Sequence, residues 1–130
     1  QLKAYTQEQK LENYIEFAGF QTDINAFMQR IDVFVLTSKW EGFGYVLAEA
    51  AACGKPAIAF DISSNPELIV DGETGFLVKP FDINSLARKV LLLAQNSSMR
   101  EQYGKNAYHR VQKKFSFKNS VSKFEDYLES

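Results

Sequence analysis

The amino-acid sequence predicts an α/β fold in which helices cover a Rossmann-like parallel β-sheet. Apolar runs of strand length alternate with segments of helical periodicity along most of the 130 residues. The apolar runs are continuous rather than alternating, which is typical of strands that a parallel sheet buries on both faces. Turn-forming residues separate these segments, so the boundaries between the predicted elements are well marked.

Four segments have the apolar, strand-length composition that a buried parallel sheet requires. The predicted strands span residues 14–18, 32–37, 56–60 and 75–78. Asp71-Gly72 and Thr74-Gly75 predict turns on either side of the last strand, because glycine and aspartate favour turn conformations. The strands are therefore spaced as expected for a sheet with helical connections.

Helical patterns lie between the predicted strands and dominate the last third of the chain. We expect helices at about 6–12, 23–30, 45–53 and 66–70, followed by three that begin near Asp82, Met99 and Ser116. Asp23 and Asp82 are suitable N-caps, and Gly54 followed by Pro56 is a typical helix stop. In the helix after Asp82, Leu86, Val90 and Leu93 recur at helical spacing. Residues from about 99 to 130 are expected to form a helical tail.

The composition indicates a single soluble domain spanning residues 1–130. A chain of this length buries about two thirds of its unfolded surface on folding. Its hydrophobic content of 45% and charged content of 24% are ordinary globular values. The net charge of -1 disfavours nucleic acid as a partner. The basic strip at 110–118 is short and is interpreted as a solvated helix face. The single cysteine, Cys53, is compatible with a reducing compartment.

Two carboxylates, Glu41 and Glu49, are the leading candidate site residues. Glu41 follows the predicted strand at 32–37, and Glu49 lies about one turn inside a predicted helix among alanines. In open parallel sheets, ligands bind beyond the carboxyl ends of the strands, where loops lead into helix N-termini that favour anions. Gly42 and Gly44 allow backbone amides to approach such a ligand closely. The pattern therefore favours a phosphate or diphosphate, with Glu49 reaching toward vicinal hydroxyls such as a ribose diol.

Loops after the neighbouring strands are expected to converge on the same edge of the sheet. Phe20 is a candidate contact for a base, and Ser38 is a candidate contact for phosphate. An alternative remains for Glu41 and Glu49, in which they are a helix-entry charge and an internal salt bridge, because acidic residues near a helix start are favourable without any ligand. The only histidine, His109, has no second histidine and no ligand spacing beside it, so no metal site is predicted.

Several short motifs follow one another in a defined order along the chain. They are Ser38-Lys39-Trp40-Glu41-Gly42-Phe43-Gly44 through Glu49-Ala50, Gly54-Lys55-Pro56, Pro66-Glu67, and Asp71-Gly72 with Thr74-Gly75. This combination resembles the C-terminal, nucleotide-sugar-binding domain of retaining GT-B glycosyltransferases of the group 1 or family 4 kind. The resemblance covers most of the chain.

The resemblance implies that the parent enzyme transfers a hexose, with retention of configuration, from a nucleotide-sugar to a sugar, lipid-linked or polysaccharide acceptor. It implies a catalytic-site role for Glu41, which would lie near the donor sugar and orient its hydroxyls, and a ribose-binding role for Glu49. The candidate donor-binding residues are Phe20, Ser38, Gly42, Phe43, Gly44, Tyr45 and Glu49. A UDP-, GDP- or ADP-sugar is the expected substrate, and no further cofactor or metal is expected.

The chain departs from the family pattern in two places. The donor domains of relatives normally begin with a further strand, a Gly-Arg loop and a lysine, then another strand, and nothing upstream of Leu11 supplies these. Ser63-Ser64 stands where relatives often have paired glycines, which predicts a stiffer loop. We therefore expect the later part of a donor domain from a longer cytoplasmic enzyme, with any contact at the inner membrane face made through the missing part. The isolated fragment is expected to be inactive.

Two alternative function classes were compared with this one. A non-catalytic nucleotide- or partner-binding module fits the same fold, because the acceptor domain and the cationic phosphate loop are not in the chain. A dinucleotide-dependent oxidoreductase is disfavoured, because no Gly-x-Gly-x-x-Gly follows a predicted strand.

Overall fold

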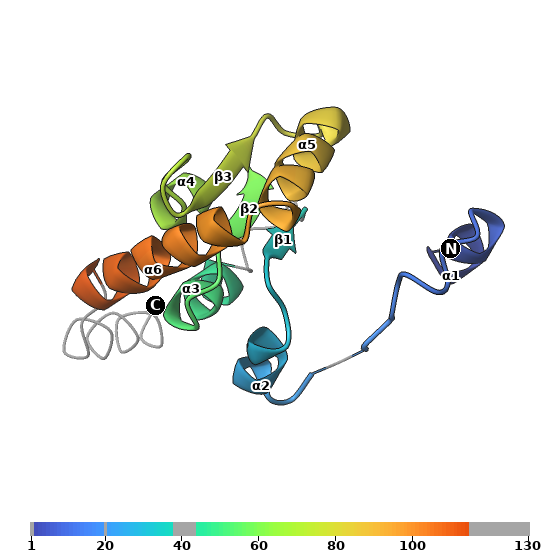
Figure 1. The fold of residues 1–130 in the computed structure, drawn as a ribbon, viewed down its shortest axis with the longest axis horizontal. Helices are drawn as coiled ribbons and strands as arrows, with labels where there is room; N and C mark the ends of the chain where they lie inside the picture. Colours follow the sequence, from blue (N-terminus) through green and yellow to red (C-terminus); the bar gives the residue numbers. More distant parts are fainter. Residues whose placement is uncertain (1, 20, 38–43, 115–130) are drawn as a thin grey trace.

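Three parallel strands form the centre of the computed structural model, which describes residues 2–19, 21–37 and 44–114 (Figure 1). The strands are β1 (Phe34–Leu36), β2 (Ala57–Phe60) and β3 (Gly75–Val78), paired in the order β1-β2-β3. The helices are α1 (Leu2–Glu8), α2 (Ile24–Gln29), α3 (Gly44–Ala52), α4 (Asn65–Leu68), α5 (Ile83–Ala94) and α6 (Ser97–Lys114). The α/β prediction with a parallel sheet is confirmed.

The central strand β2 divides the core into two layers. Its side chains alternate between the two faces of the sheet, as they do in every strand. Ile58 and Phe60 pack with residues of α5 and α6, whereas Ala57 and Ala59 pack with residues of α3 and α4. All four residues are buried, which explains why the sequence of this strand is continuously apolar.

The pairing of β2 with β3 requires a glycine at the start of β3. Ala57 is in register with Gly75, and a Cβ at Gly75 would overlap the carbonyl oxygen of Ala57. The turn before β3 uses Gly72 at a φ of +79°, a left-handed conformation that glycine adopts without strain. The predicted turn residues therefore form one turn at 72–74, which lies before β3 rather than on either side of it.

Helix α6 crosses close to the end of α3. Gly54 follows α3 with a φ of +72°, as expected for a helix stop. Gly104 of α6 faces this turn, and a Cβ at Gly104 would overlap the carbonyl oxygen of Gly54. Ala107, one turn further along α6, is 5% exposed. The two helices thus approach through small residues.

The predicted N-caps are confirmed for α2 and α5. The carboxylate of Asp23 accepts a hydrogen bond from the backbone amide of Ala26, and that of Asp82 accepts one from Ser85, each at 3.0 Å. The apolar positions of α5 predicted from helical spacing all pack against the sheet. The helix predicted to begin near Ser116 lies outside the described residues.

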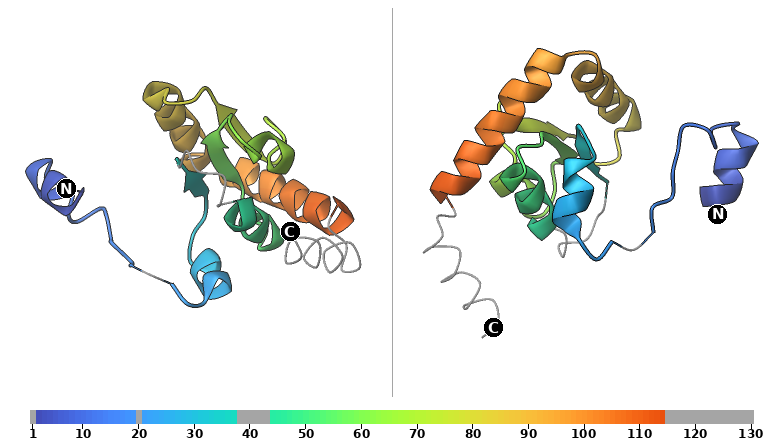
Figure 2. Two further views of the ribbon diagram at one scale, coloured as in Figure 1. Left: turned by 180° about the vertical axis from the view of Figure 1, so that it is seen from behind. Right: turned by 60° about the horizontal axis from the view of Figure 1, so that its bottom comes forward.

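The strand predicted at 14–18 is wrong. The backbone amides of Tyr14 and Ile15 both donate to the carbonyl of Leu11, so the segment starts in a turn rather than in a sheet. No strand of the described chain pairs with it, and Tyr14 is 83% exposed. Figures 1 and 2 show α1 and the following chain set apart from the sheet. An apolar composition alone does not form a strand without a neighbouring edge.

The first helix is also displaced from its predicted position. The helix expected at 6–12 forms at Leu2–Glu8 instead, where the Thr6 hydroxyl donates to the carbonyl of Leu2 at 2.8 Å. A left-handed residue, Lys10, follows at a φ of +59° and prevents the helix from continuing.

Candidate functional site

The carboxyl ends of the three strands lie at one edge of the sheet, because the strands are parallel. After β2, the loop 61–64 leads into α4, and after β3, the loop 79–82 leads into α5. Helix α3 begins at Gly44, beyond the end of β1. Three helix N-termini therefore follow this edge, and it is the position where ligands bind in folds of this type.

Glu49 projects into solvent from the second turn of α3. Its neighbours Leu47 and Ala50 are 2% and 0% exposed, so the opposite face of the helix is fixed in the core. Glu49 itself is exposed, and its carboxylate has no ion-pair or hydrogen-bond partner among the described residues. The alternative in which this residue serves an internal salt bridge therefore receives no support from the described part of the chain.

Of the seven other predicted site residues, the described part of the chain contains two. Glu41, Gly42, Phe43, Ser38 and Phe20 lie outside the described residues. The two remaining residues of the predicted set, Gly44 and Tyr45, are the first two residues of α3. Of the predicted set, the structure therefore places Gly44, Tyr45 and Glu49.

Gly19, Gln21 and the first turn of α3 lie on one cavity. The cavity is an open hollow of about 790 Å³, bounded by α1, the segment 16–19, α2, β1 and α3. Gly19 and Gln21 contribute to its lining from the loop, and Val46 contributes from α3. Gly19 and Gln21 thus share a cavity with α3, although the strand that was expected to precede their loop does not form. Most of the remaining lining is apolar, from Phe17, Ile24, Phe27, Met28 and Phe34.

Two non-glycine residues in the left-handed region lie at the carboxyl edge of the sheet. Ser63 follows β2 with a φ of +56°, and Phe81 follows β3 with a φ of +65°. Such conformations cost about 1–2 kcal/mol for an L-residue and are often found at functional sites. Sequence reasoning did not identify Phe81. The paired glycines that relatives often have at 63–64 did indicate a left-handed backbone at Ser63.

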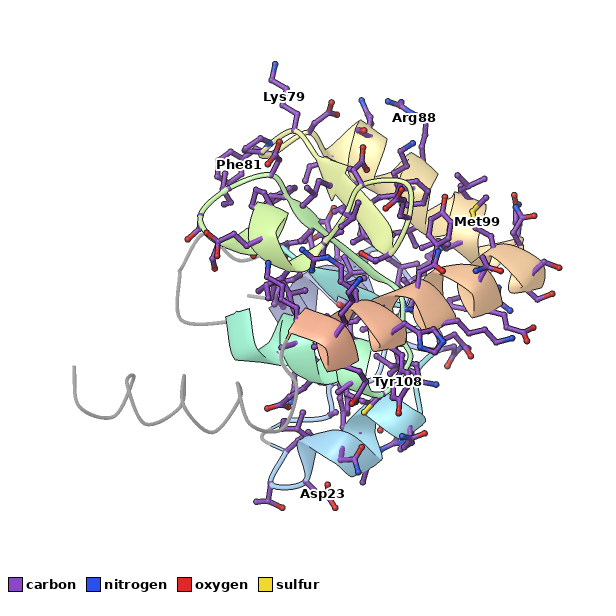
Figure 3. All side chains as sticks on the ribbon, turned by 90° about the vertical axis from the view of Figure 1, so that its left-hand side faces the viewer. Asp23, Lys79, Phe81, Arg88, Met99 and Tyr108 are labelled. Carbon is purple, nitrogen blue, oxygen red and sulfur yellow. The ribbon has the colours of Figure 1, made fainter. Side chains whose placement is uncertain are left out.

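The loop after β3 presents an exposed ring and a cation at the same edge. Phe81 is 59% exposed, and its ring centroid lies 5.4 Å from that of Phe60 at the end of β2. Figure 3 shows Lys79 and Phe81 at the same end of the molecule, with Lys79 projecting away from the body. Lys79 was not among the residues predicted from the sequence.

Asn65 fixes the loop after β2. Its side chain is 6% exposed, and Nδ2 donates to the carbonyl oxygen of Phe60 at 2.9 Å. The bond ties the first residue of α4 to the last residue of β2. Glu67, two positions later, has an exposed side chain, while its carbonyl accepts hydrogen bonds from α6. The position of α4, which contacts α3, is thus fixed by hydrogen bonds to backbone carbonyls.

The described residues hold no group of three or more histidine, cysteine, aspartate or glutamate side chains arranged to bind a metal ion. Within the same part of the chain, no helix combines the length and the apolarity that a membrane span needs.

The thiol of Cys53 donates to Oδ1 of Asn25 at 3.0 Å, which links the end of α3 to α2.

The comparisons with known proteins identify the family. A family model described as "Glycosyl transferases group 1" matches residues 1–110. The chain belongs to this glycosyltransferase family. One curated relative in the family is N-acetyl-alpha-D-glucosaminyl L-malate synthase of Bacillus anthracis, which is 31% identical over 115 residues. That alignment covers 88% of this chain and 30% of the synthase.

Solved structures of glycosyltransferases have the same fold. Sucrose-phosphate synthase from Thermosynechococcus elongatus matches with a TM-score of 0.85 and 30% identity, over 98% of this chain and 33% of that one. HepE from Anabaena, in complex with UDP-glucose, matches with a TM-score of 0.86 and 29% identity, over 98% and 35%. The chain therefore spans about a third of the length of these glycosyltransferases.

Proposed function

We propose that this chain is the donor-binding part of a glycosyltransferase that moves a hexose from a nucleotide-sugar to a sugar, lipid-linked or polysaccharide acceptor with retention of configuration. The observation that carries the proposal is Glu49, an exposed carboxylate without a described partner on the helix that begins at the carboxyl edge of the sheet. The family membership and the ordered motifs around Glu49 support this assignment.

The diphosphate of the donor would bind at the start of α3. The first amides of a helix lack intrahelical acceptors, and the helix dipole places about half a positive charge there. Gly42 and Gly44, which have no side chains, would let the phosphates approach these amides. Ser38, Phe43 and Tyr45 flank the same stretch of sequence and would complete the contacts to phosphate and sugar.

The nucleoside would extend from the start of α3 along its exposed face. Helical side chains lean toward the N-terminus of their helix, so Glu49 would reach back toward the ribose hydroxyls and accept their hydrogen bonds. The cavity beside Gly19 and Val46 adjoins the first turn of α3, and Phe20 would contact the base from this side.

Glu41 would orient the hydroxyl groups of the donor sugar. Sugar transfer passes through an oxocarbenium-like state while negative charge develops on the departing nucleoside diphosphate. Fixed amides and charges stabilise such a state because they need no reorganisation during the reaction. Additional cations for the diphosphate would come from parts of the enzyme outside this chain, which spans about a third of its relatives.

A nucleotide titration tests the proposal directly. UDP, GDP and ADP are added separately to the labelled chain while amide chemical shifts are recorded. UDP is the first choice, because a similar protein was solved with UDP-glucose. We expect saturable shifts centred on residues 44–49, and Glu49→Ala is expected to weaken the binding by about tenfold, since a charged hydrogen-bond acceptor contributes about 1.5–3 kcal/mol.

Glu101→Ala is the matched control for Glu49→Ala. Glu101 is also an exposed helical carboxylate, and its ion pair with Lys105 at 3.6 Å is exposed and contributes little. The control is expected to bind like the wild type. Equal loss in both variants, or shifts confined to other elements, would contradict the proposed site. Nucleotide binding by a full-length parent enzyme without sugar transfer would instead favour the non-catalytic module.

A further inference from the structure

One face of α6 carries three hydrogen-bond donors spaced four residues apart, Asn106, Arg110 and Lys114. Asn106 Nδ2 donates to the carbonyl oxygen of Glu73 at 2.8 Å. Arg110 Nη2 and Lys114 Nζ both donate to the carbonyl oxygen of Glu67, at 2.7 and 3.2 Å. Residues four apart lie on the same face of a helix, so these three side chains form one row, called the donor row below.

Both acceptors of the donor row belong to the connection between β2 and β3. This connection contains α4, which is only four residues long. A helix of this length is not stable on its own, because its nucleation costs more than its few hydrogen bonds return. Its position must therefore come from contacts with the rest of the protein.

The connection is tethered at both ends of α4. At the N-terminal end, Asn65 Nδ2 donates to the carbonyl oxygen of Phe60. At the C-terminal end, Glu67 has one of the last four carbonyls of the helix, which accept no hydrogen bond from within the helix. Two cationic side chains of the donor row donate to this carbonyl instead. Cations at a helix C-terminus are also favoured by the helix dipole.

Helix α6, which carries the donor row, is itself packed against the rest of the protein. Gly104 faces the turn after α3, Ala107 is buried, and the rings of Tyr103 and Phe76 lie 5.4 Å apart. Helix α6 thus packs against the core, and its residues Arg110 and Lys114 bind α4. Helix α4 in turn contacts α3, which carries Glu49.

We propose that Arg110 is a positioning residue for the nucleotide-sugar site. By holding the Glu67 carbonyl, it fixes α4 and the left-handed turn at Ser63 against the carboxyl edge of the sheet, beside α3. The proposal rests on the proposed function, since the turn matters only if the donor binds at this edge. It assigns a role in the site to a side chain on a helix that follows all the family motifs.

The first test measures hydrogen exchange in the ligand-free chain. The amide of Glu67 donates to Ser64 and that of Ile69 to Asn65, each at 3.0 Å, so these amides report on α4. Arg110→Met is expected to speed their exchange by about fivefold or more relative to the wild type, while the amides of β2 are unchanged. Arg110→Lys keeps a cationic donor and is expected to restore part of the protection.

Lys113→Met is the matched control, because Lys113 is an exposed cation of the same helical turn and forms no hydrogen bond with Glu67. The control is expected to exchange like the wild type. An equal effect of both methionine variants would overturn the proposal. A uniform rise in exchange through α4 and the sheet would also overturn it, because it would mean a loss of global stability alone.

The second test adds UDP to the same variants. Arg110→Met is expected to weaken binding by about threefold or more and to reduce the shifts at Ser63 and Ser64, with Arg110→Lys intermediate. Unchanged affinity in Arg110→Met would overturn the positioning role. A wild-type chain that binds no nucleotide would contradict the proposed function, whereas protection of α4 that does not depend on Arg110 would contradict the tether, so the two failures are distinguishable.

Discussion

Replacing Gly104 by alanine tests the close packing of α6 against the end of α3. In an isolated helix this substitution would stabilise by about 1 kcal/mol, because alanine has the higher helix propensity. In this protein the new Cβ would overlap the carbonyl oxygen of Gly54. The atom on the other side is backbone, so relief requires α6 to move away rather than a side chain to rotate.

The movement of α6 would disturb two further contacts. Ala107, which is 5% exposed, and the Tyr103–Phe76 ring pair at 5.4 Å both depend on the present position of the helix. Overpacking of this kind costs about 1–3 kcal/mol. Because the overlap is with backbone, the cost falls in the upper part of this range, about 2–3 kcal/mol. After the gain of about 1 kcal/mol in helix propensity, we expect Gly104→Ala to lower the free energy of unfolding by about 1–2 kcal/mol.

Urea unfolding followed by circular dichroism measures this change. Lys105→Ala is the control, since it is an exposed substitution in the same helix turn and removes only the exposed ion pair with Glu101. The control is expected to change the unfolding free energy by less than about 0.5 kcal/mol. A Gly104→Ala variant as stable as the wild type, or more stable, would refute the packing described for α6.

Three further substitutions probe the sheet edge and the core. Ser63→Gly removes the strain of a φ of +56° and is expected to stabilise by about 0.5 kcal/mol, the relief being partly offset by the entropy of glycine in the unfolded chain; thermal unfolding would show the rise in midpoint. Asn65→Ala removes the buried bond to Phe60 and is expected to cost about 1–2 kcal/mol in urea unfolding, and a neutral result would contradict the fixed loop. Leu93→Ala empties a site that is 0% exposed and is expected to cost about 2–5 kcal/mol, whereas a loss below 1 kcal/mol would mean that α5 does not pack as described.

The sequence predicted the elements whose stability is local or whose burial is complete. The strand at 75–78 forms with those bounds, β2 begins one residue later than predicted, and α3 is shifted by one residue at both ends. Caps at Asp23 and Asp82 were predictable because each depends on a side chain and an amide three residues apart. The strand predicted at 14–18 failed for the opposite reason, because a strand also needs a neighbouring edge that sequence composition does not supply.

The candidate site was predictable only where it follows from short motifs. Glu49 was identified from its spacing and its alanine surroundings; the structure places it exposed on α3, and its role in binding stays a prediction. Arg110 and Lys114 were interpreted as part of a solvated strip; Lys114 is indeed exposed, but the sequence did not indicate that both side chains donate to the carbonyl of Glu67. These bonds join residues 43 and 47 positions apart, and a backbone carbonyl as acceptor leaves no trace in the sequence.

A crystal structure of the chain with UDP would test the central claim most directly. The proposed site requires the diphosphate beside the first amides of α3 and a ribose hydroxyl within hydrogen-bond distance of the Glu49 carboxylate. UDP bound elsewhere, with Glu49 still facing solvent, would contradict the assignment of this helix as the donor site.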